Sequence, residues 1–408
     1  MSLLKTRLSL LAILFLLFPI TGCWDIKYLN EVAVVLAMGI DRNEDQSELI
    51  DVTVQVALPR EVAGGKEGTS ASTGEGPPTI IYQESGKTIF EVIRKMSKIT
   101  SRRLFFAHNQ AVIIGESLAK EGVGTLFDLI DRDSELRSNF DILVAKKQKA
   151  SDVLQTMTLF EKIPVREIYH TVKTNEKSLG SSYSVDVNSF INALMSDKKM
   201  PVAGSIEIVG DRNKAKENSN IATMQPEAYL KLGTMAIFNK GKWVDYLNEN
   251  ESMGLSFIQD NITSSNITVS CGQEENASME IIHSKTRVKA SVVNNKPKIM
   301  IKVDQKANIA ESRCTSFDVF EQKNIDVLEQ TTQDRVRGNM ESALKKLQSD
   351  LKVDSVGFGE AVYRAAPQYW KNNKDRWHEI YPSVPVEIHV KTNIKGTGIK
   401  SRSYLQQK

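Results

Sequence analysis

Strand and helix signals alternate between residues 80 and 200, and this alternation is the strongest constraint on what the chain can fold into. The stretches at 110–114 and 140–145 are short and rich in aliphatic residues, as strands are. Each is followed by a segment whose apolar residues recur at helical spacing. Such alternation is typical of a sheet covered by helices. We therefore predict an α+β (mixed α/β) fold in which helices pack on mixed β-sheets.

The first 22 residues have the organisation of an export leader. Lys5 and Arg7 give it a basic start, and an apolar run of 13 residues follows at 8–20. A helix that crosses a bilayer needs roughly 20 apolar residues, so this run is too short to span. The leader is therefore predicted to direct export.

The leader ends at Cys23 in a pattern that resembles the bacterial lipobox. Thr21 and Gly22 are small, as a signal peptidase requires, and the Cys23 thiol can carry a diacylglycerol. Each buried CH₂ of an acyl chain adds about 0.8 kcal/mol of membrane affinity, so two or three chains anchor stably. We predict that Cys23 is the lipidated first residue of the mature chain, with S-diacylglycerol and N-palmitoyl groups. An ordinary signal peptide with an incidental cysteine, or an uncleaved anchor, is the alternative.

Size and charge limit the function of the mature chain. Its 386 residues suffice for two or three domains of about 100 to 200 residues each. Without Lys5 and Arg7, 51 basic side chains stand against 50 acidic ones. We find no basic block with interleaved aromatic residues, so nucleic acid is not an expected partner.

Shifts in composition indicate the domain limits. A polar stretch rich in asparagine and lysine follows residue 210, and a Gly/Ser/Thr-rich stretch at 64–78 is predicted to be a loop. We predict a lipoprotein signal peptide at 1–22, an N-terminal α/β domain at 23–200, a middle domain at 201–275 and a C-terminal α/β domain with a long helix at 276–408.

Three patterns mark the C-terminal part. Residues 286–304 alternate and break at 294–297, which predicts a hairpin. Residues 318–351 carry one apolar stripe, which predicts a long helix packed on its own sheet, with a coiled-coil surface as the alternative. Residues 384–393 alternate cleanly, as a half-buried strand does.

A search for catalytic chemistry finds little. None of the five histidines has the spacing of a zinc site, and no nucleophile elbow or phosphate-binding glycine loop follows a strand. Gly357-Phe358-Gly359 resembles part of a nucleotide loop, but we interpret it as a tightly packed helix C-terminus. We predict no catalytic residue, no metal and no cofactor.

Two groups of residues are tempting as binding sites. His108 lies beside Arg102, Arg103 and two phenylalanines, but we interpret it as a residue of a turn that leads into a strand. Trp370, Trp377 and Tyr381 share one side of a helix, where they could bind a ring or a membrane interface. We favour a core position for these three.

Cys271 and Cys314 are the cysteines that remain once Cys23 carries lipid. Outside a membrane they could pair, but two cysteines do not make a disulfide framework. We expect two separate thiols, and a Cys271–Cys314 bridge is the alternative.

In order along the chain, several segments resemble the Ger(x)C, or GerAC-type, spore germination lipoproteins of endospore-forming bacteria. They are Cys23-Trp24-Asp25 after the lipobox, "AVVLAMGID", "SRRLFFAHNQAVIIGESLAKEG", "LFDLIDRDSELR", "ILVAKKQKASDVL", "GTMAIFNKGKWVDYL", "SVGFGEAVYRAAPQYWKNNKDRW" and the final alternating strand. The resemblance covers nearly the whole length. The insert at 64–78 departs from it, which leaves the local contacts of that loop open.

The resemblance implies three α/β domains held by lipid on the outer surface of the spore's inner membrane. It implies the C-type subunit of a nutrient germinant receptor, beside A-type and B-type integral membrane subunits. Such receptors respond to amino acids, sugars or nucleosides, and direct contact of this subunit with the nutrient is left open. The family implies no catalytic residue, and Cys23 alone is carried over.

Two functions of other classes compete with this interpretation. A substrate-binding lipoprotein of a transporter should show two lobes around a ligand cleft. A cell-wall hydrolase should show a catalytic pair of side chains.

Overall fold

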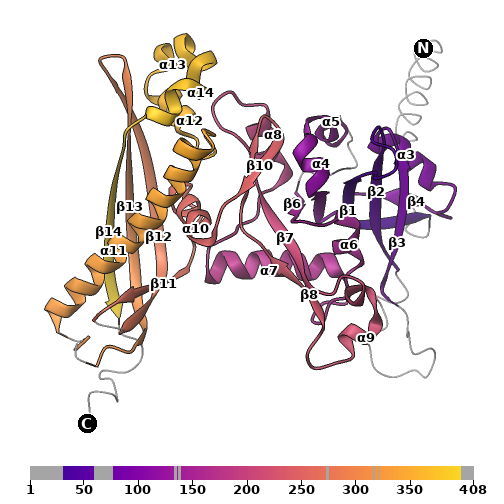
Figure 1. Cartoon of the computed structure of the whole chain (residues 1–408), viewed down its shortest axis with the longest axis horizontal. Coiled ribbons are helices and arrows are strands. Elements are labelled where there is room, and N and C mark those ends of the chain that lie inside the picture. Colours follow the sequence, from indigo (N-terminus) through magenta and orange to yellow (C-terminus); the bar gives the residue numbers. More distant parts are fainter. Residues whose placement is uncertain are drawn as a thin grey trace, which may run out of the picture.

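The computed structural model describes residues 31–58, 77–132, 136, 139–272, 275–315, 318–319 and 321–396. These residues form two mixed sheets at opposite ends of an elongated molecule (Figure 1). The predicted mixed α/β class is thereby confirmed. The leader, Cys23 and the insert up to residue 76 lie outside the described residues.

The larger sheet has ten strands. Its path runs β10-β9-β7-β6-β5-β1-β2-β3, and β4 and β8 pair with β1 and β7. The strands are β1 (Val32–Arg42), β2 (Ile50–Ala57), β3 (Thr79–Gly86), β4 (Arg103–Phe105), β5 (Ala111–Gly115), β6 (Asp141–Ala145), β7 (Val202–Gly210), β8 (Ala228–Leu232), β9 (Ala236–Asn239) and β10 (Lys242–Tyr246). Since β7 pairs with β6, the sheet continues past residue 200, and the predicted division into domains stays a prediction.

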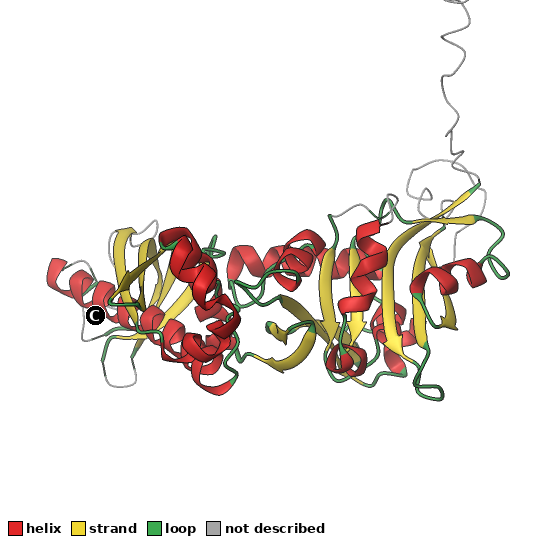
Figure 2. Cartoon of the chain, turned by 90° about the horizontal axis from the view of Figure 1, so that it is seen from above, coloured by secondary structure: helices red, strands yellow, loops and turns green. Residues whose placement is uncertain are grey.

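Helices cover both faces of this sheet (Figure 2). Its central strands β1, β5, β6 and β7 are parallel, and parallel strands are normally buried on both sides. Ile113 and Ile114 are adjacent in β5 and both fully buried, each in a different apolar cluster. The covering helices are α3 (Ile89–Met96), α4 (Glu116–Glu121), α5 (Gly124–Arg132) and α8 (Val187–Leu194) on one face, and α6 (Ala150–Gln155) and α7 (Pro164–Ser178) on the other.

The smaller sheet has the order β11-β12-β13-β14. Its strands are β11 (Ser265–Ser270), β12 (Asn276–Val293), β13 (Lys296–Ser312) and β14 (Val386–Gly396). The predicted hairpin is confirmed, because β12 and β13 are antiparallel and meet at Asn294 and Asn295, both with positive φ. The predicted final strand is also confirmed and lies parallel to β13.

The predicted long helix is α11 (Gln322–Leu344), which continues as a π-helical segment, η3 (Lys345–Asp350). It packs on one face of the smaller sheet (Figure 1), so the interpretation as a core helix is confirmed. A short helix, α9 (Asn218–Ile221), follows β7, and the remaining helices are α10 (Glu249–Ile258), α12 (Phe358–Ala365), α13 (Pro367–Asn373) and α14 (Trp377–Ile380).

Helix α10 joins the two sheets. Its residues 252–258 are all buried, and it lies between the larger sheet and α11 (Figure 1). A Cβ on Gly254 would collide with the backbone oxygen of Asn339 in α11, so only glycine allows this approach. One apolar cluster therefore continues from the larger sheet through α10 into the smaller one.

The predicted core position of the three aromatic residues is confirmed, but they lie on three short helices, α13, α14 and η5 (Tyr381–Ser383), and not on one side of a single helix. Trp370, Trp377 and Tyr381 are all buried, with the two indole rings 5.2 Å apart. The Trp377 Nε1 donates to Oδ2 of the buried Asp354 at 2.8 Å. Burial therefore places these rings beside a carboxylate of the core.

The interpretation of Gly357 as part of a helix C-terminus is wrong. Gly357 has φ of 85° and precedes the first turn of α12. The Asp354 carboxylate accepts from the backbone N–H groups of Gly357, Phe358 and Gly359 at 2.7–3.0 Å, so it caps the start of that helix. Two closely spaced glycines indicate tight packing at either end of a helix. The Asp354 cap, three residues before Gly357, shows that these glycines lie at its start.

Candidate functional site

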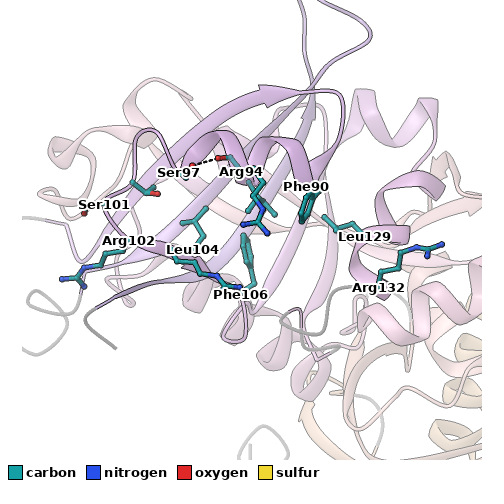
Figure 3. A pocket seen from close by; sticks show the side chains of 12 residues that line it. Phe90, Arg94, Ser97, Ser101, Arg102, Leu104, Phe106, Leu129 and Arg132 are labelled. Atoms are coloured by element: carbon teal, nitrogen blue, oxygen red, sulfur yellow. Dashed lines mark hydrogen bonds between the residues drawn. The ribbon is translucent and has the colours of Figure 1, made fainter. Parts of the chain in front are cut away.

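An arginine-lined pocket of about 740 Å³ lies where α3, β4 and the end of α5 meet (Figure 3). Its lining consists of Phe90, Ile93, Arg94, Ser97, Thr100, Ser101, Arg102, Arg103, Leu104, Phe106, Leu129 and Arg132. We call it the arginine pocket. A smaller hollow of about 400 Å³ shares Phe90, Leu129 and Arg132 with it, so the depression continues between α3 and α5.

Helix α3 supplies one wall of the pocket. The Thr88 hydroxyl accepts from the backbone N–H of Glu91, and the Glu91 carboxylate accepts from that of Lys87, so the start of the helix is fixed. Its apolar face packs on the sheet through Ile89, Val92 and Met96. The opposite face leaves Phe90 and Arg94 at the pocket, with the guanidinium carbon 4.9 Å from the ring centroid.

Strand β4 supplies the floor. It pairs in parallel with the start of β1, with Arg103 opposite Val32. Leu104 and Phe106 are buried two residues apart, as alternation along an extended chain requires. Figure 3 shows Phe106 and Arg94 facing each other across the pocket while Arg102 points outward.

The charges around the pocket are unevenly paired. Arg132 pairs with Asp128 at 2.9 Å, and Lys95 pairs with Glu91 at 2.8 Å. The hydrogen bond from Lys95 lowers the pKa of the Glu91 carboxyl. The Arg94 guanidinium lies over the face of the Phe90 ring in a cation–π contact, and it points into the pocket. An apolar floor below guanidinium groups suits an anion that carries an apolar part.

His108 lies outside this pocket. It occupies the turn between β4 and β5, where its exposed ring meets the edge of Phe105 at 6.0 Å. The interpretation of His108 as a turn residue is confirmed. Arg102 and Arg103, which the sequence places beside it, do line the pocket. The pocket itself was missed, because its other wall comes from α3 and α5.

Two buried carboxylates have structural roles. Asp41 accepts from the backbone N–H groups of Ala150 and Ser151 at 2.7 and 2.9 Å, at the start of α6. Burial raises the pKa of Asp41 to about 6, and burial does the same for Asp354. Since both groups cap helices, neither is free to act as a general acid or base.

A second hollow of about 690 Å³ lies between the β9–β10 turn and the C-terminal helices. Lys240, Lys242, Lys352 and Lys374 border it together with Asp197 and Asp375. Positively charged lysines and negatively charged carboxylates are mixed here, and Lys374 pairs with Asp197 at 3.6 Å. The mixture gives no preference for one ligand charge.

Cys271 and Cys314 form a disulfide with their Cα atoms 6.0 Å apart. The expectation of two separate thiols is therefore wrong. The bridge closes the open end of the β12–β13 hairpin, where Asn276 and Ser312 lie near the last ladder pairs. Cys271 follows β11 and Cys314 follows β13, so the pairing of both strands with β12 brings these cysteines together, and spacing alone does not reveal that register.

Within the described residues, no cluster of three or more His, Cys, Asp or Glu side chains could hold a metal ion. Among the same residues, no helix is both long and apolar enough to cross a membrane.

Two family models match the chain. Residues 25–208 match "Spore germination protein N-terminal domain", and residues 233–398 match "Spore germination B3/GerAC like, C-terminal". A solved structure, described as the crystal structure of the GerBC protein, is similar with a TM-score of 0.55 and 20% identity. The similarity covers 91% of this chain and 99% of that one, and it confirms the fold.

Curated relatives match over nearly the whole length. Spore germination protein KC of Bacillus subtilis (strain 168) is 31% identical over 98% of both chains. The putative spore germination protein YfkR of the same organism is 26% identical over 95% of both chains, and its spore germination protein B3 is 23% identical over 97% of this chain and 99% of that one. The chain therefore belongs to the Ger(x)C (GerAC-like) family of spore germination proteins.

Proposed function

We propose that this chain is a lipid-anchored, non-enzymatic subunit of a spore nutrient germinant receptor. The observation that carries the proposal is the full-length likeness to spore germination protein KC, combined with a leader that ends at Cys23. The subunit would lie on the outer surface of the spore inner membrane beside A-type and B-type integral membrane subunits. It would be required for the response to one small nutrient, an amino acid, a sugar or a nucleoside.

The non-enzymatic role is supported by how the fold uses its buried carboxylates. Asp41 and Asp354 both accept backbone hydrogen bonds at helix starts. A catalytic pair needs side chains that face a common open site, whereas Asp41 lies at the start of α6 and Asp354 before α12. The family relationship also favours the receptor over a transporter's substrate-binding lipoprotein.

The direct test is germination of spores that lack this chain. Dipicolinate release is measured after challenge with amino acids, sugars and nucleosides in turn, and exogenous calcium dipicolinate serves as the receptor-independent control. We expect one nutrient response to disappear while the control response survives. If all nutrient responses persist in a strain that also lacks the paralogous receptors, the proposal is wrong.

The anchor is tested separately with Cys23→Ala. The wild-type chain should incorporate labelled palmitate and sediment with membranes, and the variant should do neither. Cys271→Ser/Cys314→Ser is the matched control, because it removes two cysteines that form a disulfide and leaves the leader intact. Equal palmitate labelling of wild type and Cys23→Ala would contradict lipidation at this residue.

A further inference from the structure

The segment 94–103, "RKMSKITSRR", is the most one-sided stretch of charge beside the arginine pocket. It carries five basic residues and no acidic one. Arg94 and Arg102 both line the pocket and are exposed, and Lys98 is exposed nearby. A positive cluster of this density attracts anionic surfaces and anionic groups.

Apolar side chains stand at the rim of the same segment. Ile99, in the middle of the basic run, is 50% exposed, and Phe90, one turn before Arg94, is 49% exposed. Exposed apolar residues between basic ones are typical of surfaces that lie in the interface of a membrane. The buried Leu104 and Phe106 continue this apolar character into the floor of the pocket.

The pocket lies beside the start of β1, the first strand after Cys23 among the described residues. The backbone N–H of Arg103 donates to the Glu31 oxygen at 3.1 Å, and Arg103 pairs with Val32. Val32 lies nine positions after Cys23, and such a segment reaches at most about 30 Å. A lipid on Cys23 would therefore hold this end of the molecule near the bilayer.

We propose that the arginine pocket binds the phosphate headgroup of an anionic membrane lipid and thereby docks the N-terminal end of the molecule on the bilayer. The Arg94 guanidinium, which points into the pocket, contacts the phosphate, Arg102 adds positive charge at the rim, and Ile99 and Phe90 enter the interface. This docking rests on the proposed anchor at Cys23 for its position, but binding of the headgroup does not require the anchor. A docked subunit presents a fixed face to neighbouring membrane subunits, whereas a tether alone leaves its orientation open.

The open face of the smaller sheet supplies a matched control. Lys289 and Lys302 are exposed there, in a sheet at the other end of the molecule (Figure 1). The same face also carries acidic partners, since Arg287 pairs with Asp304 at 2.8 Å and Lys298 with Glu387 at 2.7 Å. Replacing Lys289 and Lys302 with glutamine removes two positive charges, as replacing Arg94 and Arg102 does, so both variants have the same net charge.

The first experiment titrates the full chain with short-chain lipids below their micelle concentration. An environment-sensitive fluorophore on Ile99→Cys in a Cys23→Ser background reports binding, because Cys271 and Cys314 are joined and do not react. Dihexanoyl phosphatidylglycerol should give a saturable signal, and dihexanoyl phosphatidylcholine and inorganic phosphate should give much weaker ones. A response to inorganic phosphate as strong as that to phosphatidylglycerol would overturn the lipid assignment.

The second experiment places the lipidated chain on vesicles with and without phosphatidylglycerol. The reporter at position 99 should respond only on the anionic vesicles, and added salt should reverse the response. Each basic residue near an anionic surface changes binding about fivefold, so Arg94→Gln/Arg102→Gln should lower the docked-to-undocked ratio about 25-fold. Lys289→Gln/Lys302→Gln should leave it unchanged.

The outcomes separate this proposal from the proposed function. If the chain floats with vesicles but the reporter does not distinguish anionic from neutral lipid, docking is wrong and the anchor stands. If both charge variants lose the response equally, the attraction is general and no headgroup site exists. If the chain fails to float, the anchor is wrong, and the short-chain titration still decides whether the pocket binds the headgroup.

Discussion

The central strands of the larger sheet are buried on both faces, whereas the strands of the smaller sheet bury one face and expose the other. In β5 the adjacent Ile113 and Ile114 are both fully buried. In β13 the buried Ile301 is followed by the exposed Lys302. The first pattern gives continuous apolar runs and the second gives strict alternation, because helices cover two faces in one case and one in the other.

The comparison also explains how the two units are held. The larger sheet relies on helices that pack from both sides, including α6 and α7 on the second face. The smaller sheet has one covered face, a disulfide across its hairpin and a long helix on its inner side. A unit with less apolar burial therefore has a covalent link that the other lacks among its described residues.

Substitution of adjacent strand residues tests the comparison most strongly. Ile113→Ala and Ile114→Ala should each lower the free energy of unfolding by about 2–5 kcal/mol, because each leaves a cavity in a different core. Ile301→Ala should cost a similar amount, whereas Lys302→Ala should stay within about 0.5 kcal/mol. Chemical denaturation measures all four. A cost for Lys302→Ala as large as that for Ile301→Ala would show that the open face is covered.

The disulfide should account for the next largest effect. Closing a chain loop across a sequence separation of 43 restricts the unfolded state, which corresponds to up to about 4 kcal/mol. Cys271→Ser/Cys314→Ser should therefore lower the unfolding midpoint. Reductant should reproduce the loss in wild type and have no effect on the double variant. Equal stability with and without reductant would contradict a stabilising bridge.

The two buried helix caps predict a pH dependence. Burial raises the pKa of Asp354 to about 6 in the folded protein, above its ordinary 3.8, so the folded state binds a proton more tightly than the unfolded chain. The contribution of this group to stability is therefore largest below about pH 4 and falls by about 3 kcal/mol as pH rises through 6. The difference in unfolding free energy between wild type and Asp354→Asn should show this slope.

Tryptophan fluorescence is a suitable measurement for Asp354, because Trp377 donates to its carboxylate. Asp41→Asn should show the same sign in the larger sheet, since the pKa of Asp41 is also raised to about 6 by burial. A difference that grows with pH would mean that the hydrogen bonds to the carboxylate outweigh its burial.

Two glycines in the helices that join the sheets should give opposite and smaller effects. Gly254→Ala should cost about 1–3 kcal/mol, because the new methyl group meets the backbone of α11. Gly338→Ala should stabilise by about 0.5–1 kcal/mol, because a Cβ there has no neighbour within 4 Å and alanine favours helix. Thermal unfolding of both variants checks the signs. A neutral Gly254→Ala would mean that α10 and α11 can move apart without loss.

Sequence patterns predicted the local elements well and their pairing poorly. Periodicity located the long helix α11 and the alternating β14, because each depends on residues that are close in the chain. Three long-range features escaped it: the pairing of β7 with β6, the disulfide and the cap that Asp354 places on α12. The strand pairing and the disulfide depend on the register between strands that are distant in the chain. The cap depends on one aspartate, which the sequence does not distinguish from the many other carboxylates.

The arginine pocket shows the same limit. The sequence shows basic and aromatic residues at 102–106, but His108 beside them lies in a turn and not in the pocket. The second wall comes from α3, whose Arg94 and Phe90 face the pocket only because Ile89 and Val92 pack on the sheet. The helical spacing of Ile89 and Val92 could have predicted which face of α3 points outward. That α3 lies next to β4 could be known only from the folded structure.

The parallel pairing of β13 with β14 has a consequence for how the chain matures. Strand β13 ends at Ser312 and its partner begins at Val386, so synthesis of more than 70 residues separates them. During that interval the alternating apolar edge at 299–303 has no neighbour and is a template for pairing with other chains. A nascent chain therefore passes through a stage in which this edge is open, and a slow or interrupted ribosome would prolong its exposure.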